Sequence, residues 1–375
     1  MTHDEKIYYE ELFGLIAERS AAYGRAAEAQ IAVWEGGVPD EHPLLLRCGF
    51  PSGCDFPSYN PGEVHHDRAK MLLAGMRDML SAALGDAQAV PSARANMGCG
   101  IFPSLFPGIA PLLFDDGKMP WVKQHLDRDT IVRLRESDIK ITDEFKIALE
   151  HTAYIAEHIR GTGAYAYPPD LQGPFDTAHI VYGDAIFYDI YDDPAFMHHL
   201  MDLSCYAIEL GFSECLKVLP GSESIVAHYN DVVLPRSRGG LKISEDTSTL
   251  LSSGHIDEYV TPYTRRVLER FGGGYIHYCG KNDYLLEQIL QEELICGLNF
   301  GNPNKHDMDD VLRRTAQAGK VFYGWIPKPK DESLPDYFGR LRRAATADGK
   351  CRLLLQYSAP YEMREEVLDA WRYAK

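Results

Sequence analysis

The stretch Gly274-Tyr275-Ile276-His277-Tyr278-Cys279 is a short, mostly apolar run that predicts a buried β-strand. Residues 283–293 follow it with the apolar spacing of a helix. Side chains two residues apart on a strand point to the same face, so His277 and Cys279 would project together. An imidazole and a thiolate on one face form a pair of ligands that suits zinc. The stretch therefore predicts a strand–helix unit that carries a soft-metal pair at the end of its strand.

Three further strand–helix units follow along the chain. The predicted strands cover residues 295–300, 321–326 and 351–357, and the predicted helices cover residues 307–318, 334–345 and 361–373. Repeated units of this kind imply a parallel sheet that is covered by helices. Parallel α/β barrels carry their chemistry at the carboxyl ends of the strands, which is where His277 and Cys279 fall.

The first two thirds of the chain are predicted to be richer in helix. The predicted helices cover residues 67–84, 145–159, 193–210 and 254–271, with one or two more in the first 35 residues, and the predicted strands cover residues 43–48, 89–95 and 224–228. Gly211 follows the helix over residues 193–210 and is expected to end it. Residues 98–120 are rich in Gly, Pro and Phe and predict a long loop, a type of segment that is often functional. No linker-like stretch separates these elements, so we expect one domain over residues 1–375.

The composition is that of a globular protein, and the charge balance argues against some classes of partner. Hydrophobic residues make up 45% of the 375 residues, and the formal net charge is -17. A nucleic-acid-binding protein normally carries a basic stripe, which this sequence lacks, and an anionic membrane surface would repel so acidic a chain. The sequence has neither a signal-peptide pattern at its start nor an apolar run of about 18 residues that could span a membrane. Eight cysteines without framework spacing indicate reduced thiols, and we expect a cytoplasmic location.

Several segments, taken in order, resemble the uroporphyrinogen decarboxylase superfamily. They are Gly37-Val38-Pro39-Asp40-Glu41-His42-Pro43, Asp170-Leu171-Gln172-Gly173-Pro174-Phe175-Asp176, Ile256-Asp257-Glu258-Tyr259-Val260-Thr261-Pro262-Tyr263, and His277-Tyr278-Cys279-Gly280 followed by Gly297-Leu298-Asn299-Phe300. The resemblance covers most of the chain from about Ala29 and rests on the combination of segments rather than on any one of them. It implies an eight-stranded (β/α)8 TIM barrel that is preceded by a helical extension over residues 1–35.

The family contains two chemistries, and the sequence is closer to one of them. One branch decarboxylates the acetate arms of uroporphyrinogen without a cofactor and carries two arginines after the first strand, where Leu46-Arg47-Cys48-Gly49-Phe50 keeps one. The other branch moves methyl groups between small substrates, corrinoid proteins and thiols with the help of zinc, and it shares the His-x-Cys pair. Its third ligand is a cysteine after the last strand, at the position of Ser358 in this chain. Two alternatives remain for this position: a carboxylate such as Asp231 replaces the ligand, or the third ligand is missing. Cys296 and Cys351 begin their strands and are expected at the wrong end of the barrel.

The strand ends and the resemblance together supply the candidate site residues. The candidate metal ligands are His277 and Cys279, the candidate catalytic residues are Asp231, Asp170 and Asn230, and the candidate substrate-binding residues are Arg47, Arg94, Gln172, His228, Asn299 and Asn302. A carboxylate at a strand end can act as a general acid or base, and a guanidinium can bind a carboxylate or phosphate through two parallel hydrogen bonds. Residues of these types also occur in ordinary turns, salt bridges and buried cores. Each candidate can therefore be functional or structural, and its position in the fold distinguishes the two.

Three functions fit the sequence. The first is a methyltransferase-like enzyme in which zinc at the His-x-Cys pair assists methyl transfer that involves a corrinoid protein or a small methyl donor. The second is a decarboxylase of a polycarboxylate, which needs no cofactor but needs cations such as Arg47, Arg94, Arg236 and Arg238 in its pocket. The third is a barrel that binds a corrinoid or tetrapyrrole without turning it over. The expected partners are a small-molecule substrate, a corrinoid protein and a second copy of the chain in a homodimer.

Overall fold

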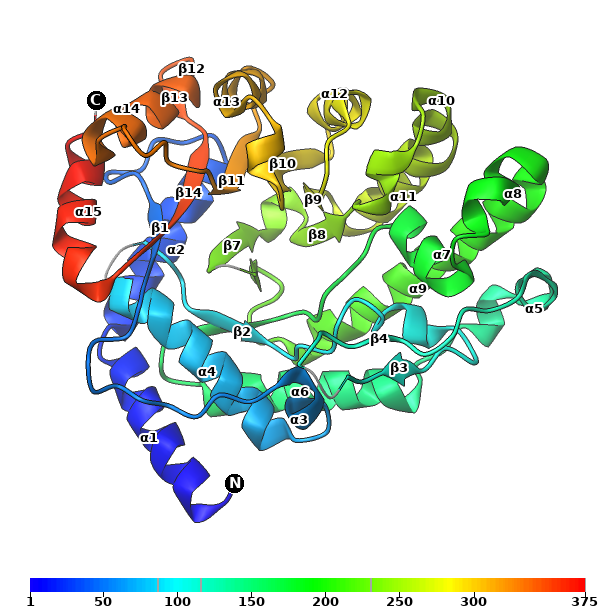
Figure 1. The fold of residues 1–375 in the computed structure, drawn as a ribbon, viewed down its shortest axis with the longest axis horizontal. Coiled ribbons are helices and arrows are strands. Elements are labelled where there is room, and N and C mark those ends of the chain that lie inside the picture. The colour runs from blue at the N-terminus through cyan, green and yellow to red at the C-terminus, as the bar shows by residue number, and fades with distance from the viewer. Residues whose placement is uncertain (86–87, 115–116, 230, 375) are drawn as a thin grey trace.

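A curved parallel sheet lies at the centre of the computed structural model, which describes residues 1–85, 88–114, 117–229 and 231–374. Six strands follow one another in the order β1-β14-β11-β10-β9-β8, and all neighbours are parallel. They are β1 (Leu44–Cys48), β8 (Leu241–Ser244), β9 (Gly274–Tyr278), β10 (Ile295–Phe300), β11 (Val321–Trp325) and β14 (Leu353–Ala359). The sheet curves around a central space, and helices lie on its outer side (Figure 1).

Two more parallel strands form a separate pair, and the chain that follows them bridges to β8. β2 (Ser92–Arg94) pairs with β5 (Tyr165–Tyr167), and Gln172, a few residues after β5, forms a parallel bridge with Ser244 of β8. The N–H of Gly173 also donates to the carbonyl of Ser244 at 2.6 Å. The eight strands thus form a TIM-like α/β arrangement, in which the described residues show no strand pairing between β1 and β2.

Each strand of the C-terminal third leads into a helix. β9, β10, β11 and β14 are followed by α12 (Asp283–Gln291), α13 (Met308–Gln317), α14 (Leu334–Ala344) and α15 (Arg364–Arg372). The side chains of Asn282, Asp307 and Ser333 each accept the backbone N–H three residues on, which caps the first three of these helices. The four predicted strand–helix units are therefore confirmed, with ends that shift by a few residues.

The N-terminal extension consists of two helices, as predicted. In α1 (His3–Ala17), Thr2 and Glu5 exchange side-chain-to-backbone hydrogen bonds in a capping box. α2 (Ser20–Trp34) packs against the amino ends of the strands, where the ring of Trp34 stacks on that of Tyr275 with 6.0 Å between centroids. This helix covers the end of the sheet opposite to the carboxyl ends of the strands.

The long helix α9 (Pro194–Val218) departs from the sequence prediction at one point. Asp193 caps its first turn, as expected, but the helix continues past Gly211 to Val218. A Cβ atom on Gly211 would lie 2.8 Å from Cε1 of Phe102 and 2.9 Å from Cζ of Phe145. Gly211 therefore does not end the helix, and its missing side chain lets α9 approach these two rings.

The predicted strand over residues 224–228 is present, but it does not join the parallel sheet as expected. It forms β6 (Ile225–His228), which pairs antiparallel with β7 (Val232–Pro235), and the strand that joins the parallel sheet is β8 further along the chain. Val232 and Leu234 of β7 are buried in a cluster with Tyr275 and Tyr323 of the sheet. The hairpin lies inside the curve of the sheet and fills part of the central space (Figure 1).

The remaining elements cover the outside and the rim of the sheet. The longer helices are α4 (Arg68–Gly85), α6 (Asp143–His158), α7 (Pro174–Tyr182) and α11 (Thr261–Phe271), and a π-helical turn at Ile256–Val260 leads into α11. The predicted loop over residues 98–120 holds a 3-10 turn (Pro103–Leu105) and the short strand β3 (Pro111–Leu112), which pairs with β4 (Trp121–Val122). Among the described residues, no helix is both long and apolar enough to cross a membrane.

Candidate metal centre

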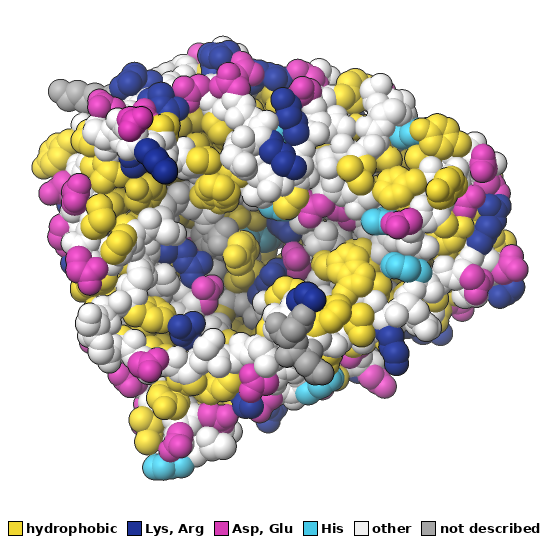
Figure 2. Space-filling model, viewed as in Figure 1, with side chains coloured by type: hydrophobic (Ala, Val, Ile, Leu, Met, Phe, Trp, Pro, Cys, Tyr) yellow, Lys and Arg dark blue, Asp and Glu magenta, His cyan; other side chains and the backbone are white. Residues whose placement is uncertain are grey.

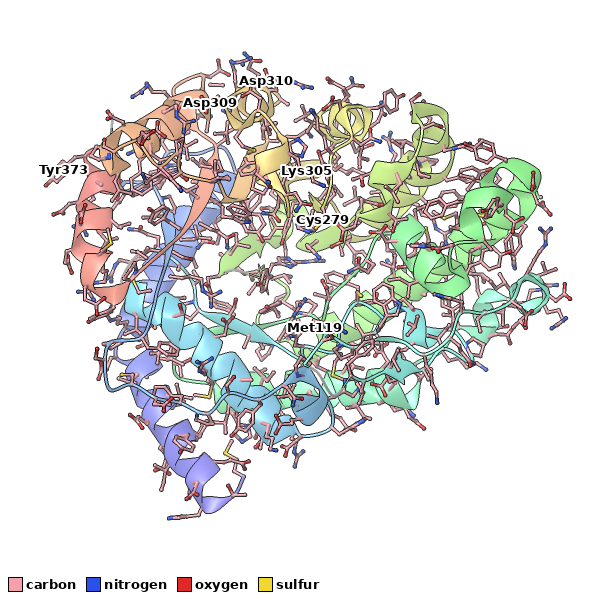
Figure 3. All side chains as sticks on the ribbon, in the orientation of Figure 1. Met119, Cys279, Lys305, Asp309, Asp310 and Tyr373 are labelled. Atoms are coloured by element: carbon pink, nitrogen blue, oxygen red, sulfur yellow. The ribbon has the colours of Figure 1, made fainter. Side chains whose placement is uncertain are left out.

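The predicted His-x-Cys pair lies at the carboxyl ends of the parallel strands. Ser244 of β8, His277 of β9 and Asn299 of β10 are in register, so their side chains form a row across three neighbouring strands. Cys279 follows directly after β9 and lies on the inner side of the curved sheet (Figure 3). Asp309 and Asp310 of α13 lie at the outer edge of the molecule in the same view. In the same view the surface is hollowed at the centre, and basic, acidic and histidine side chains surround the hollow (Figure 2).

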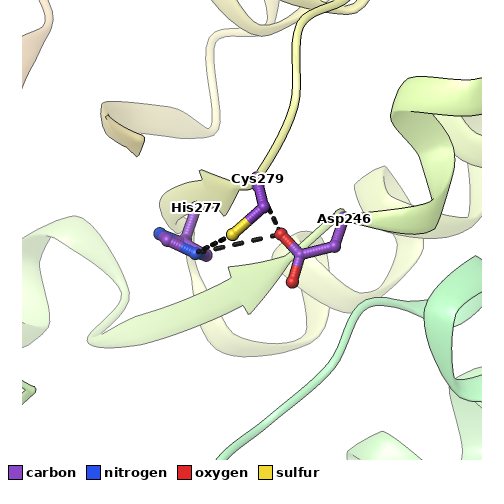
Figure 4. Close-up of side chains that lie close together, drawn as sticks. All are labelled: Asp246, His277 and Cys279. Carbon is purple, nitrogen blue, oxygen red and sulfur yellow. Dashed lines mark hydrogen bonds and ion pairs between the residues drawn. The ribbon is translucent and has the colours of Figure 1, made fainter. Parts of the chain in front are cut away.

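Asp246 joins His277 and Cys279 in a cluster of three potential ligands (Figure 4). The Sγ atom of Cys279 lies 3.7 Å from Nε2 of His277, and Oδ1 of Asp246 lies 3.8 Å from the same nitrogen. Oδ1 of Asp246 also accepts the backbone N–H of Cys279 at 2.5 Å. Within the described residues, this is the one group of three or more His, Cys, Asp and Glu side chains whose ligand atoms all lie within 4.8 Å of one another.

These separations fit a tetrahedral zinc site. With zinc bonds of about 2.3 Å to sulfur and about 2.0–2.2 Å to nitrogen or oxygen, two ligand atoms at a tetrahedral angle stand about 3.4–3.6 Å apart. The distances of 3.7 and 3.8 Å to Nε2 of His277 are slightly longer, by an amount that small side-chain rotations can supply. A thiolate and a carboxylate would balance the two charges of the ion. Three protein ligands would leave a fourth position open, which is the pattern of catalytic rather than structural zinc sites.

An amide on the neighbouring strand holds the imidazole of His277. Nδ1 of His277 and Oδ1 of Asn299 are 2.5 Å apart, and Nδ2 of Asn299 donates to the carbonyl of Tyr323 at 2.6 Å. Burial lowers the pKa of His277, and the charge of Lys242 adds to this effect, so both favour the neutral ring. A neutral imidazole whose second nitrogen is held by a hydrogen bond is the usual form of a metal-binding histidine.

The thiol of Cys279 is not activated by the protein groups around it. Partial burial of the sulfur and the charge of Asp246 raise the pKa of Cys279 to about 11. A metal ion would reverse this effect because it binds and stabilises the thiolate. A Cβ atom on Gly301 would lie 2.3 Å from the sulfur, so the glycine at this position leaves the space that the thiol occupies.

Buried carboxylates hold the loop that carries Asp246. Asp176 of α7 accepts the N–H groups of Asp246 and Thr247 at 2.6 Å each. Glu245 is buried beside them and accepts two side-chain hydroxyl groups at 2.6 and 2.5 Å. Burial raises the pKa of Asp176 well above its usual range and that of Glu245 to about 7. These contacts fix the loop after β8 so that Asp246 stands beside the His-x-Cys pair.

A row of charged side chains of both signs borders the cluster. Nζ of Lys242, on β8, lies 3.0 Å from Oδ1 of Asp170, and Nη1 of Arg94, at the end of β2, lies 3.2 Å from the same oxygen. Burial would raise the pKa of Asp170, but the two cations outweigh it and hold the pKa below its usual range. The guanidinium of Arg94 faces the rings of Tyr167 and Tyr229 at 5.9 and 5.7 Å. Two residues singled out from the sequence, Asp170 and Arg94, thus meet beside the cluster.

Arg47 and Asp231 form a second charged pair at the tip of the β6–β7 hairpin. Nη1 of Arg47 lies 3.6 Å from Oδ2 of Asp231, and Nη2 lies 2.6 Å from Oδ1 of Asp78. Asp231 is 2% exposed, and burial raises its pKa to about 7 against the attraction of Arg47. The carboxylate beside the His-x-Cys pair is Asp246 rather than Asp231, which corrects the expected replacement for the third ligand. The neighbouring candidate Asn230 lies outside the described residues.

Three other candidate substrate-binding residues make contacts within the protein that support the fold. Nε2 of His228 lies 3.1 Å from a backbone carbonyl, the ring packs edge-on against Tyr275, and burial lowers its pKa to about 3. Oδ1 of Asn302 accepts a backbone N–H at 2.8 Å in the loop after Cys279. Gln172 is buried where the chain bridges to β8. A role for these residues in substrate binding stays a prediction.

Ser358, at the position where the family resemblance predicts a third ligand, lies on a strand that is not adjacent to β9. Ser358 lies in β14, and β11 and β10 stand between that strand and β9. The thiol of Cys296 donates to the carbonyl of Gly274 at 3.1 Å, at the amino ends of β9 and β10. Cys351 lies in the short strand β13 (Lys350–Cys351), just before β14. Both cysteines are thus at the opposite end of the strands from the cluster, as predicted.

Sequence reasoning overlooks Asp246 and Lys242 because it places the strand before β9 at residues 224–228. A signal for the correct strand exists in Leu241-Lys242-Ile243-Ser244, which alternates apolar and polar residues and leads directly into Glu245-Asp246. In a parallel sheet the residues after one strand lie next to those after the neighbouring strand. The acidic pair at this strand end is therefore the carboxylate source that the sequence offers to His277 and Cys279.

Comparison with known proteins identifies a similar fold among the solved structures. No family model matches the sequence, and no curated protein matches it. Among solved structures, a methyltransferase from Methanosarcina mazei is similar, with a TM-score of 0.62, 12% sequence identity, and coverage of 92% of this chain and 98% of that chain. At this identity the likeness concerns the fold, and it extends over nearly the whole of both chains.

Proposed function

We propose that this chain is a methyltransferase-like enzyme of the uroporphyrinogen decarboxylase superfamily, with zinc held by Asp246, His277 and Cys279 at the mouth of an eight-stranded α/β barrel. The observation that carries the proposal is the spacing of the ligand atoms, 3.7 and 3.8 Å around Nε2 of His277. The similarity in fold to a methyltransferase supports the choice of transferase chemistry. The methyl donor would be a corrinoid protein or a small molecule, and the acceptor a small nucleophile such as a thiol.

Different side chains of the proposed site would have different roles in such a reaction. Zinc in this place would act as a Lewis acid that keeps a substrate thiol in its nucleophilic thiolate form at neutral pH. Asp246 and Cys279 would supply the negative charge that holds the ion, and His277 would supply a neutral nitrogen. Lys242 and Asp170 border the cluster and would orient the substrate through charges that are already fixed in place. The carbon–sulfur bond would form as the bond between the methyl group and its donor breaks.

The same residues also resemble a cysteine nucleophile with a histidine base. Cys279, His277 and Asn299 follow one another with contacts of 3.7 and 2.5 Å, in the order of a thiol, a base and an orienting amide. A nucleophilic cysteine needs a lowered pKa, but partial burial and Asp246 raise the pKa of Cys279 to about 11. A carboxylate beside the thiol hinders a nucleophile and helps a metal site, so the arrangement favours the metal.

A decarboxylase of polycarboxylates has less support because of where the cations lie. Arg47 stands beside the carboxylate of Asp231, and Arg94 stands beside that of Asp170. The other two candidates lie in the 3-10 turn Arg236–Arg238, directly before β8 and so at the amino ends of the strands. A substrate with several carboxylates needs cations that are free to pair with it, whereas Arg47 and Arg94 already face carboxylates of the protein.

Metal analysis combined with an activity screen tests the proposal. Protein purified without chelator should contain about one zinc per chain, or take it up on supplementation, and H277Q and C279S should not. With methylcobalamin and a panel of small thiols, the wild type should form thioethers that the two variants do not form. H3Q and C54S, which change the same residue types away from the cluster, serve as matched controls.

The two parts of the proposal fail in different ways. Zinc content well below one per chain that supplementation does not raise would contradict the metal site. A zinc-loaded protein that methylates none of the thiols would contradict the methyltransferase function. Spectral titration with cobalamin and porphyrin would then show whether the protein binds such a ligand without turning it over.

A further inference from the structure

We propose that Asn299 is a positioning residue that selects one tautomer of His277, the one in which Nδ1 carries the hydrogen and Nε2 presents a lone pair to the metal centre. This inference rests on the proposed metal site and deepens it. It also gives Asn299 a role different from the substrate binding expected from the sequence. A chain of hydrogen bonds crosses three strands, from Tyr323 on β11 through Asn299 on β10 to His277 on β9.

The main chain of β11 decides which way the amide of Asn299 faces. One end of this amide lies 2.6 Å from the carbonyl oxygen of Tyr323. A carbonyl oxygen can only accept a hydrogen bond, so the atom that faces it is the nitrogen Nδ2. The oxygen Oδ1 is consequently the atom that faces His277.

The orientation of the amide then decides where the proton of the imidazole lies. Oδ1 of Asn299 is 2.5 Å from Nδ1 of His277 and has no hydrogen to donate, so Nδ1 must be the donor. A neutral imidazole has one donor nitrogen and one acceptor nitrogen, so with the hydrogen on Nδ1 the other nitrogen, Nε2, is left as the acceptor. Nε2 is also the nitrogen that lies 3.7 Å from Sγ of Cys279 and 3.8 Å from Oδ1 of Asp246.

The other tautomer would block the site. A hydrogen on Nε2 would point toward Asp246 and Cys279 and occupy the direction in which the metal has to bind. The carboxylate of Asp246 by itself favours this wrong tautomer because it attracts the N–H group. Asn299 therefore counteracts a neighbouring charge, and its removal should matter more than the loss of an ordinary hydrogen bond.

Burial and close packing hold the amide of Asn299 in place. Its side chain is buried, with 7% of the residue exposed, so it offers little surface to a substrate. A Cβ atom at Gly324 would lie 2.3 Å from Nδ2 of Asn299, and Gly324 has a φ of 141°, which other residues rarely adopt. The glycine after Tyr323 thus leaves the space that the amide of Asn299 occupies when it donates to the carbonyl of Tyr323.

Two variants separate the positioning role from a merely structural one. N299D keeps an oxygen that can accept from Nδ1 of His277 but loses the donor to Tyr323, whereas N299L loses both contacts. Both variants should therefore lower the melting temperature. N299D should retain the tautomer and bind zinc within about 10-fold of wild type, while N299L should bind zinc about 10- to 100-fold more weakly, the usual effect of losing such a partner.

The tautomer itself can be read in the metal-free protein. Two-bond 15N–1H correlation spectra of protein with labelled histidine distinguish protonated from unprotonated ring nitrogens, and the signals of His277 are those that disappear in H277Q. In wild type and N299D we expect the proton on Nδ1, and in N299L a shift of the proton toward Nε2. Zinc affinity is measured on the same samples by competition with a chelator.

The outcomes distinguish this inference from the proposed function. A wild-type spectrum with the proton on Nε2 would overturn the inference even if N299L failed to fold. So would an unchanged tautomer in N299L. A wild-type protein with the proton on Nδ1 that binds no zinc would leave the role of Asn299 standing and contradict the metal site.

Discussion

Oδ1 of Asp246 accepts the backbone N–H of Cys279 at 2.5 Å and so joins the loop after β8 to the end of β9. The two residues are 33 positions apart, and the parallel pairing of β8 with β9 brings them together. The same oxygen lies 3.8 Å from Nε2 of His277. Asp246 therefore has two roles that can be separated, one in holding the loop and one in offering a charged ligand.

The variant D246N should keep the first role and lose the second. An asparagine oxygen can still accept the N–H of Cys279, but it brings no negative charge to a metal ion. We expect zinc affinity to fall by at least about 10-fold, the scale on which even the outer partners of a metal act. Chelator competition measures this, with D129N as an exposed control of the same chemical change. Equal affinity of D246N and wild type would remove Asp246 from the ligand set.

Zinc binding should release one proton per chain near neutral pH. With a pKa of about 11, the thiol of Cys279 is protonated there and must lose its proton to bind. The lowered pKa of His277 leaves that ring with no extra proton to give up. Zinc affinity should therefore rise about 10-fold for each unit of pH below the pKa of the thiol. Calorimetry in buffers with different ionisation enthalpies counts the protons, and a count of two would mean that His277 is charged in the metal-free protein.

The variant G301A should damage the metal site while leaving the fold intact. A Cβ atom at this position would lie 2.3 Å from Sγ of Cys279 and 3.5 Å from Cε1 of His277, so the sulfur would have to move. We expect weaker zinc binding together with a small change in melting temperature. G254A is the matched control, since a Cβ atom there meets nothing within 4 Å. Normal zinc affinity in G301A would show that the sulfur does not need this space.

The variant D231N should change how stability depends on pH. Burial raises the pKa of Asp231 to about 7 in the folded protein, well above its value in an unfolded chain. The folded state holds this proton more tightly, so the contribution to stability is present at about pH 4 and is lost as the pH rises through about 7. Asparagine cannot ionise, and D231N should therefore lose less stability than wild type across this range in urea unfolding. Parallel curves for the two proteins would show that Asp231 ionises as it does in the unfolded chain.

The C-terminal strand–helix units could be predicted from the sequence because their signals are local. A mostly apolar run such as that of β10 and a capping residue such as Asp307 identify a strand and a helix start without reference to the rest of the chain. The His-x-Cys pair could be located for the same reason, since it lies on one of these strands. Whether such a sheet closes into a barrel depends on pairing between strands far apart in sequence, which no local pattern encodes.

The third ligand could not be located because it depends on which strand lies next to β9. β8 has four residues, and the apolar strands of the β6–β7 hairpin precede it and compete for the same place in the sheet. The hairpin strand β6 offers the stronger apolar run, yet it pairs with β7 inside the curve of the sheet. Asp231 and Asp246 each follow a short strand, and only the tertiary arrangement separates them.

Gly211 shows a similar limit for a single residue. Glycine after an apolar helical pattern predicts a helix end, but glycine inside a helix also marks a close contact with another element. The rings of Phe102 and Phe145, which decide between these meanings, are far from Gly211 in the sequence and touch it only in the folded chain.

The variant G211A tests whether that close contact is real. Alanine favours a helix over glycine by up to about 1 kcal/mol, so without the rings the substitution would stabilise α9. With a Cβ atom 2.8 Å from Phe102 and 2.9 Å from Phe145, overpacking should dominate and destabilise the protein by about 1–3 kcal/mol. Urea unfolding measures the difference. G14A, in α1, is the matched control because its Cβ atom meets nothing within 4 Å, and it should be neutral or stabilising. If G211A were as stable as G14A, the two rings would have room to move aside, and the packing of α9 would not need glycine at this position.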